Sequence, residues 1–173
     1  MILFLDTEFT SLDEPDLISI GLSSEDGGHE FYAERTDFDR LDCSEFVRAA
    51  VLPKLGRPMG VPGGTLNWAA LGATLWEWLA QIQIEHGDVR VAFDYPADQE
   101  LMVSALDGDV PPGVTFQNIA YFLNWSGCTR KDRGTDVNWH HSLWDARALR
   151  EDWQAAGGLN TWQAWEDVMR KME

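Results

Sequence analysis

The chain has few cysteines and no long apolar run, and each shortage excludes a class of protein. Its 173 residues include two cysteines, Cys43 and Cys128, without the spacing of a metal site. We therefore expect free thiols and a reducing, cytoplasmic location rather than a disulfide framework. No apolar run approaches the roughly 20 residues of a membrane span. The N-terminus meets an acid at Asp6 instead of carrying basic residues, so we expect no secretory signal.

Positive charge is also scarce. The chain has 13 Lys and Arg against 29 Asp and Glu, a net charge of −16. Proteins that hold long nucleic acids tightly usually present a basic surface, because their contacts release counterions. An acidic protein can still act on phosphodiesters if cations bridge the substrate and the site. The charge therefore favours short or loosely held substrates, or argues against a nucleic-acid function altogether. A chain this acidic could also mimic nucleic acid and occupy a basic partner.

The hydrophobic content of 45% is enough for a packed core, and the length fits one domain over residues 1–173. Apolar runs and turn residues predict an α/β fold whose sheet combines an antiparallel meander with parallel strands and is flanked by helices. The predicted strands cover 1–8, 17–22, 29–33, 89–93 and 114–119. The predicted helices cover 44–55, 65–86, 98–106, 142–155 and a final amphipathic segment from 162. The segments 57–64 and 124–138 are predicted loops.

Two carboxylates stand at the end of the first predicted strand. Asp6 and Glu8 are two positions apart after a continuous apolar run. Side chains alternate between the faces of a strand, so these two point the same way and Thr7 points the opposite way. Two acids on one face repel each other, and a hard divalent cation such as Mg²⁺ or Mn²⁺ relieves that repulsion. The alternative is a strand that simply ends in solvent.

The second chemical signal lies at the start of the 142–155 helix. Ser142 is the predicted N-cap, which places Asp145 in the first turn. If His140 were helical too, it would lie about 140° around the helix from Asp145. With His140 on the preceding loop, the two side chains can converge. A His beside metal carboxylates is suited to accept a proton from water. The alternative is that Asp145 only stabilises a helix start.

Together these motifs resemble the DEDD superfamily of 3′–5′ exonucleases, in the branch whose general base is His. That family has a ribonuclease H-like fold, with Asp-x-Glu on its first strand and a His followed after four residues by Asp. Asp6-Thr7-Glu8 and the pair His140 and Asp145 match these motifs. The sequence is also similar to a small bacterial group of 3′–5′ exoribonucleases with the pattern His-x-x-Leu-x-Asp-Ala-Arg.

The middle motif of the family is an Asp near the start of the helix after the fourth strand. Asp94 and Asp98 both fit by position. Asp98 is favoured because the apolar pair Leu101-Met102 follows it at the family spacing, and Asp94 remains the alternative.

The resemblance also implies substrate contacts. The stretch from Asp6 to Leu12 is similar to the oligoribonuclease pattern, which would place Thr10 at the scissile nucleotide and Leu12 against terminal bases. Ser11 departs from the usual Gly. The only dense basic cluster, Arg130, Lys131 and Arg133, precedes His140 and is either a phosphate contact or a solvated loop.

The resemblance implies a mechanism with two Mg²⁺ or Mn²⁺ ions. The ions would be held by Asp6, Glu8, Asp98 and Asp145, with His140 as the base. The expected activity is hydrolysis of single-stranded RNA from its 3′ end. The alternatives are a DNA exonuclease of the same fold and a non-catalytic acidic protein that mimics nucleic acid. We expect no membrane partner, and the sequence leaves open whether the chain is a monomer or a homodimer.

Overall fold

The computed structural model describes residues 1–56, 59–128 and 139–171, and its centre is a mixed sheet of six strands. The order across the sheet is β4-β3-β2-β1-β5-β6. The first three strands form the antiparallel meander, and the β3–β4, β1–β5 and β5–β6 pairs are parallel. This confirms the predicted α/β class and is consistent with a ribonuclease H-like fold. The strands are β1 (Ile2–Phe9), β2 (Leu17–Ser24), β3 (Glu30–Arg35), β4 (Gly63–Leu66), β5 (Val89–Phe93) and β6 (Val114–Asn118).

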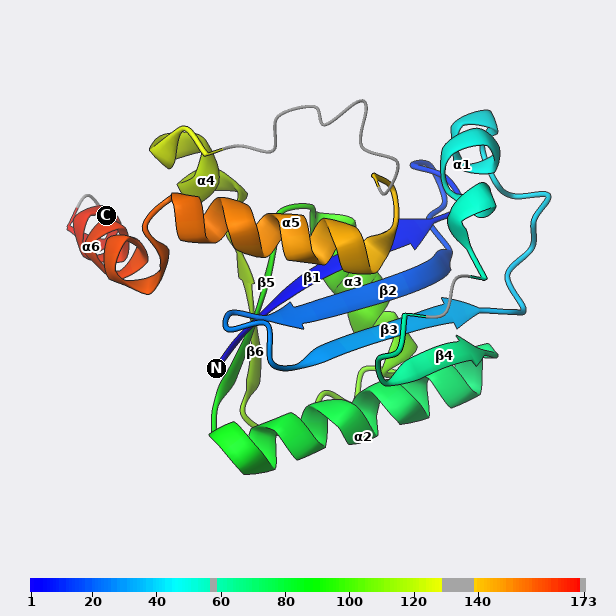
Figure 1. The fold of residues 1–173 in the computed structure, drawn as a ribbon, viewed down its shortest axis with the longest axis horizontal. Helices are drawn as coiled ribbons and strands as arrows, with labels where there is room; N and C mark the ends of the chain where they lie inside the picture. The colour runs from blue at the N-terminus through cyan, green and yellow to red at the C-terminus, as the bar shows by residue number, and fades with distance from the viewer. Residues whose placement is uncertain (57–58, 129–138, 172–173) are drawn as a thin grey trace.

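Helices cover both faces of the sheet (Figure 1). One face packs against α2 and α3, and α5 crosses the other face over β1 and β2. Within the described ranges, no helix is both long enough and apolar enough to cross a lipid bilayer. The helices are α1 (Glu45–Ala50), a 3₁₀ turn (Leu52–Lys54), α2 (Trp68–His86), α3 (Pro96–Ala105), α4 (Ala120–Ser126), α5 (Ser142–Ala155) and α6 (Gly158–Arg170).

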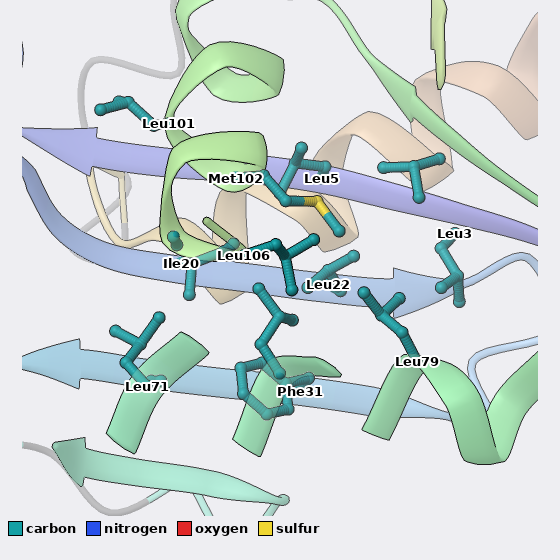
Figure 2. Close-up of a cluster of buried hydrophobic side chains, with 14 of the residues drawn as sticks. Leu3, Leu5, Ile20, Leu22, Phe31, Leu71, Leu79, Leu101, Met102 and Leu106 are labelled. Carbon is teal, nitrogen blue, oxygen red and sulfur yellow. The ribbon is translucent and has the colours of Figure 1, made fainter. Parts of the chain in front are cut away.

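The alternation of side chains along β1 divides the core in two. Leu3 and Leu5 face α2 and α3, where they join Leu79 and Met102 (Figure 2). Ile2 and Phe4 face α5, where they pack with Leu149 and Trp153. Each apolar side chain buried in this way stabilises the fold by about 1.5–3 kcal/mol. Because β1 is buried on both faces, its register cannot slip. Each later side chain on this strand must therefore continue the same alternation between the two faces.

Local patterns predicted several boundaries well. β5 spans 89–93 and runs parallel to β1, as expected, and α5 spans 142–155. Ser44 is the N-cap of α1, and its hydroxyl accepts a hydrogen bond from the Val47 N–H. Gly87 closes α2 with a positive φ of 76°.

Two predicted loops are wrong in part. The segment 57–64 was predicted as loop, but β4 begins at Gly63 and extends to Leu66, so α2 starts later than expected, with Asn67 as N-cap. A Cβ on Gly63 would lie 2.0 Å from the Tyr32 carbonyl oxygen, so only glycine allows this close pairing. The polar segment from 124 was also predicted as loop, but residues 120–126 form α4.

Tertiary contact accounts for α4. Its buried Phe122 lies against Trp153 of α5 and Trp162 of α6, with ring centroids 5.3 and 5.1 Å away. The helix is too short to be stable by its own propensity, so packing determines it.

Candidate active site

Asp6 and Glu8 end β1 on the face that α5 covers. They continue the row of Ile2 and Phe4, so they share one direction as strand alternation predicts. Both are largely buried, with 7% and 9% of their surface exposed. The strand therefore does not end in solvent, and its two acids point into the molecule.

Thr7 points to the opposite face and fixes the acid of α3. Its N–H and its hydroxyl both donate to Asp98 Oδ1, at 3.0 and 2.7 Å. Asp98 itself is only 2% exposed, and Leu101 and Met102 behind it anchor α3 in the core. Two donors on one oxygen hold the carboxylate in a single orientation.

Both candidates for the middle motif lie beside Asp6. Carboxylate oxygens of Asp6, Asp94 and Asp98 are all within 4.8 Å of one another. Asp94 follows the last residue of β5 and is half-buried. The parallel pairing of β1 and β5 brings their carboxyl ends to the same edge of the sheet, so the acids that follow them meet.

The third motif approaches from α5. Ser142 is not the N-cap, as the sequence suggested, but the first helical residue. The N-cap is His141, whose carbonyl accepts the Asp145 N–H at 2.9 Å. The Ser142 hydroxyl instead pairs with that of Ser19 at 3.1 Å in the interior. A buried partner on β2 therefore outweighs the capping preference of this Ser.

His140 lies on the loop before α5, where it can converge with Asp145. Its backbone is left-handed, with a φ of +67°. The His140 backbone N–H donates to Asp145 Oδ2, with 3.0 Å between nitrogen and oxygen. Ligand atoms of Glu8, His140 and Asp145 are within 4.8 Å of one another. The ring of Phe46 contacts the imidazole edge-on, with centroids 4.8 Å apart. The imidazole thus lies between the carboxylates and an aromatic side chain.

The close approach of α5 depends on Gly21. This residue of β2 pairs with Asp6, and a Cβ on it would lie 2.3 Å from the Leu143 nitrogen and 2.4 Å from the Ser142 carbonyl carbon. Real Cβ atoms essentially never come this close to backbone. Glycine at this position therefore lets the first turn of α5 bring Asp145 down to the end of β1.

An ion pair holds the same helix to β3. The Arg147 guanidinium donates two bonds to the Glu30 carboxylate, at 2.7 and 2.5 Å. Hydrogen bonding to Arg147 lowers the pKa of Glu30 below its usual range, against the opposing effect of burial. The geometry is bidentate, the arrangement in which Arg and carboxylate interact most strongly. This gives Arg147 of the third motif a structural role.

The acids line a cavity of about 680 Å³. Its apolar wall carries Phe9, Leu12, Phe46, Tyr95 and Trp139. Leu12 is 76% exposed. The aromatic residues of this wall carry no signal in the sequence, because an aromatic residue in a helix or strand is usually core. Phe9 and Tyr95 stack with centroids 6.2 Å apart.

Thr10 is not among the residues that line the cavity. It is fully buried, and its hydroxyl accepts the Asp16 N–H and donates to the Glu14 carbonyl. These bonds close the turn that presents Leu12. Arg130, Lys131 and Arg133 lie outside the described residues.

Comparison with known proteins gives a partial match. No family model matches the sequence. Two curated relatives, 3′–5′ exoribonucleases from two strains of Mycobacterium tuberculosis, are each 48% identical over 56 residues. That segment covers 32% of this chain and 33% of each relative, so the similarity spans about a third of the relatives' length. Over that segment the chain is similar to proteins named as exoribonucleases.

Proposed function

We propose that the protein is a 3′–5′ exoribonuclease of the DEDD type with a His base, acting on single-stranded RNA ends. One observation carries the proposal. Asp6, Glu8, Asp98 and Asp145, all nine-tenths or more buried, converge from three separate segments with His140 in one cavity. The partial match to proteins named 3′–5′ exoribonuclease supports the same activity.

The donor set fits divalent cations. Carboxylate oxygens are the ligands that Mg²⁺ and Mn²⁺ prefer, and the acids form two adjacent groups. We propose that Asp6 and Asp98, with Asp94 beside them, serve one ion and that Glu8 and Asp145 serve the other. Such ions would supply Lewis-acid activation of water and charge neutralisation at the phosphate.

The chain's own groups would perform the remaining tasks. An imidazole nitrogen of His140 accepts the proton of the attacking water. The hydrogen bond from the His140 backbone N–H to the Asp145 carboxylate keeps the imidazole close to the acids. Thr7 keeps Asp98 in a fixed orientation. Aromatic rings around the cavity offer faces on which unpaired bases can stack, an interaction worth about 1–3 kcal/mol per base. Duplex bases are already stacked, so the site favours single strands.

The burial of the acids argues against the alternative of a nucleic-acid mimic. A mimic presents charge on its surface to a basic partner. Here the four motif acids are at most 9% exposed and are directed into a cavity. Their arrangement suits ions or a small reacting group rather than the flat surface of a partner protein.

The decisive assay compares linear and circular single-stranded RNA of one sequence, with matched DNA, in Mg²⁺, Mn²⁺ or EDTA. We expect the linear RNA to shorten one nucleotide at a time from its 3′ end, only with metal, and the circle to stay intact. Equal rates on circle and linear RNA would reveal an endonuclease, and equal trimming of DNA would reveal a DNA exonuclease. Full activity in EDTA would overturn the metal assignment.

A further inference from the structure

A second cluster of metal-ligating side chains lies at the other end of the sheet. His29 is in the turn between β2 and β3, and Glu85 and His86 end α2. Their ligand atoms are all within 4.8 Å of one another. The register pairs Phe9 with Leu17 at one end of β1 and Leu3 with Ser24 at the other, so this cluster is remote from Asp6 and Glu8. Figure 1 shows the end of α2 near this turn.

The two imidazoles meet through their Nε2 atoms, which are 3.0 Å apart. Two neutral imidazoles can share one hydrogen bond at this distance. Two nitrogen ligands of a tetrahedral zinc ion, each at about 2.0–2.1 Å from the metal, lie at a similar separation. A carboxylate oxygen of Glu85 is 3.8 Å from His86 Nε2, so it can complete a third ligand position.

The backbone on both sides holds the ligands in place. The His29 carbonyl accepts the Ser24 N–H at 2.8 Å, and the His29 N–H donates to the Ser24 hydroxyl at 2.9 Å. His86 is the last residue of a 19-residue helix that Gly87 closes. The backbone that carries both imidazoles is therefore fixed, and the two histidines come from segments 57 residues apart.

Charge favours a cation at this position. The carboxyl end of a helix carries a partial negative charge, and a cation there is stabilising. Glu85 adds a full negative charge in that last turn. The helix dipole disfavours an acid at this end, and a bound cation would offset the repulsion. All three side chains are at least partly exposed, so an ion from solution can reach them.

We propose that His29, Glu85 and His86 form a site for a divalent transition metal of the zinc type. Two imidazoles with one carboxylate suit Zn²⁺, Ni²⁺ or Cu²⁺ better than Mg²⁺, whereas the all-carboxylate group of Asp6, Asp94 and Asp98 suits Mg²⁺. Three protein ligands leave one position for water. The bound ion joins the end of α2 to the β2–β3 turn and so stabilises the folded chain.

The test is a zinc titration of the full metal-free chain by calorimetry, in excess Mg²⁺ so that the carboxylate cavity is saturated. We expect one Zn²⁺ per chain. His29→Ala and His86→Ala should each weaken its affinity about tenfold or more, because each removes one of three ligands. His140→Ala, a matched histidine change in the cavity, should leave the affinity unchanged, as should Asp98→Asn.

The imidazole NMR signals of the unaltered protein provide a second measurement. Zinc should shift those of His29 and His86 together at one equivalent. Absence of zinc binding would show that the two rings only share a hydrogen bond. Unchanged affinity in both histidine variants would place the ion elsewhere. Either result overturns the site without bearing on the exonuclease proposal, because no activity is measured.

Discussion

At the residue scale, the division of roles between carboxylates and imidazole can be tested. His140 is half-buried, and the Phe46 and Trp139 rings both contact its imidazole edge-on. The four motif acids are more deeply buried than it is. We therefore propose that the acids bind metal and that the more accessible imidazole transfers the proton.

His140→Ala should lower turnover about 10²–10⁴-fold, the usual loss when a general base is removed. The affinity for Mn²⁺, measured by calorimetry, should change little, because the carboxylates remain. A collapse of Mn²⁺ affinity would instead make His140 a ligand. His29→Ala is the matched control and should leave turnover unchanged.

Asp98→Ala should abolish metal-supported hydrolysis, and Asp94→Ala should leave much of it. Asp98 is 2% exposed and receives two bonds from Thr7, whereas Asp94 is only half-buried. Initial rates at saturating Mn²⁺ measure the difference, with circular dichroism to confirm that both variants fold. The reverse ranking would make Asp94 the acid of the middle motif.

At the element scale, the position of α5 decides whether the site exists. This helix carries Asp145 and follows His140. Its contacts with the sheet include the close approach to Gly21, the Ser19–Ser142 pair and the Arg147–Glu30 ion pair. Changes at these contacts leave every proposed catalytic group present and alter only their distances.

Gly21→Ala should reduce turnover strongly and lower the free energy of unfolding by about 1–3 kcal/mol. The added methyl group would overlap the backbone of Ser142 and Leu143, so the first turn of α5 must move away from β1. Denaturant unfolding and RNA trimming rates measure the two effects. Gly28→Ala in the exposed β2–β3 turn is the control. Wild-type turnover in Gly21→Ala would show that the close approach is not required.

Glu30→Gln should lower the free energy of unfolding by about 1 kcal/mol at neutral pH. Solvent screens the partly exposed ion pair, so this loss is smaller than for a fully buried pair. Because the folded pKa of Glu30 lies below its ordinary value of 4.5, its contribution is present above that pH and is lost as the pH falls through the folded pKa. Urea unfolding at neutral pH and well below 4.5 should therefore show the difference from wild type shrinking. A difference that is independent of pH would contradict the ion pair's role.

Sequence patterns predicted the elements with strong local signals, and missed those that depend on distant contacts. The apolar run of β1, the β5 run, the N-cap of α1 and the C-cap of α2 are readable within a few residues. β4 depends on a glycine that meets the Tyr32 carbonyl, and α4 on aromatic neighbours from α5 and α6.

The same distinction holds for the site. Motif spacing predicted that His140 would converge with Asp145. It could not predict that Thr7 holds Asp98 or that Gly21 admits α5, because each requires two distant segments in contact.

At the scale of the whole molecule, ion binding should stabilise the native state, because the unfolded chain does not bring the carboxylates together. Mg²⁺ or Mn²⁺ at 100 times its dissociation constant should raise the melting temperature by about 5–10 °C. A thermal melt with and without EDTA measures the shift. Glu85→Gln should keep the Mg²⁺ shift and Asp98→Ala should lose it. No shift in the wild-type protein would contradict the metal model.

The pairing of β1 with β5 also governs how the molecule can form during synthesis. β1 is synthesised well before its parallel partner, which starts at Val89, and before the motif acid of α5, residue 145. At typical rates of about 5–20 residues per second, the central strand waits roughly 4–18 s for that partner. Until α5 emerges, a nascent chain beside ribosomal RNA lacks Asp145 and His140. The proposed hydrolytic activity should therefore arise only once α5 has been synthesised and has packed against β1.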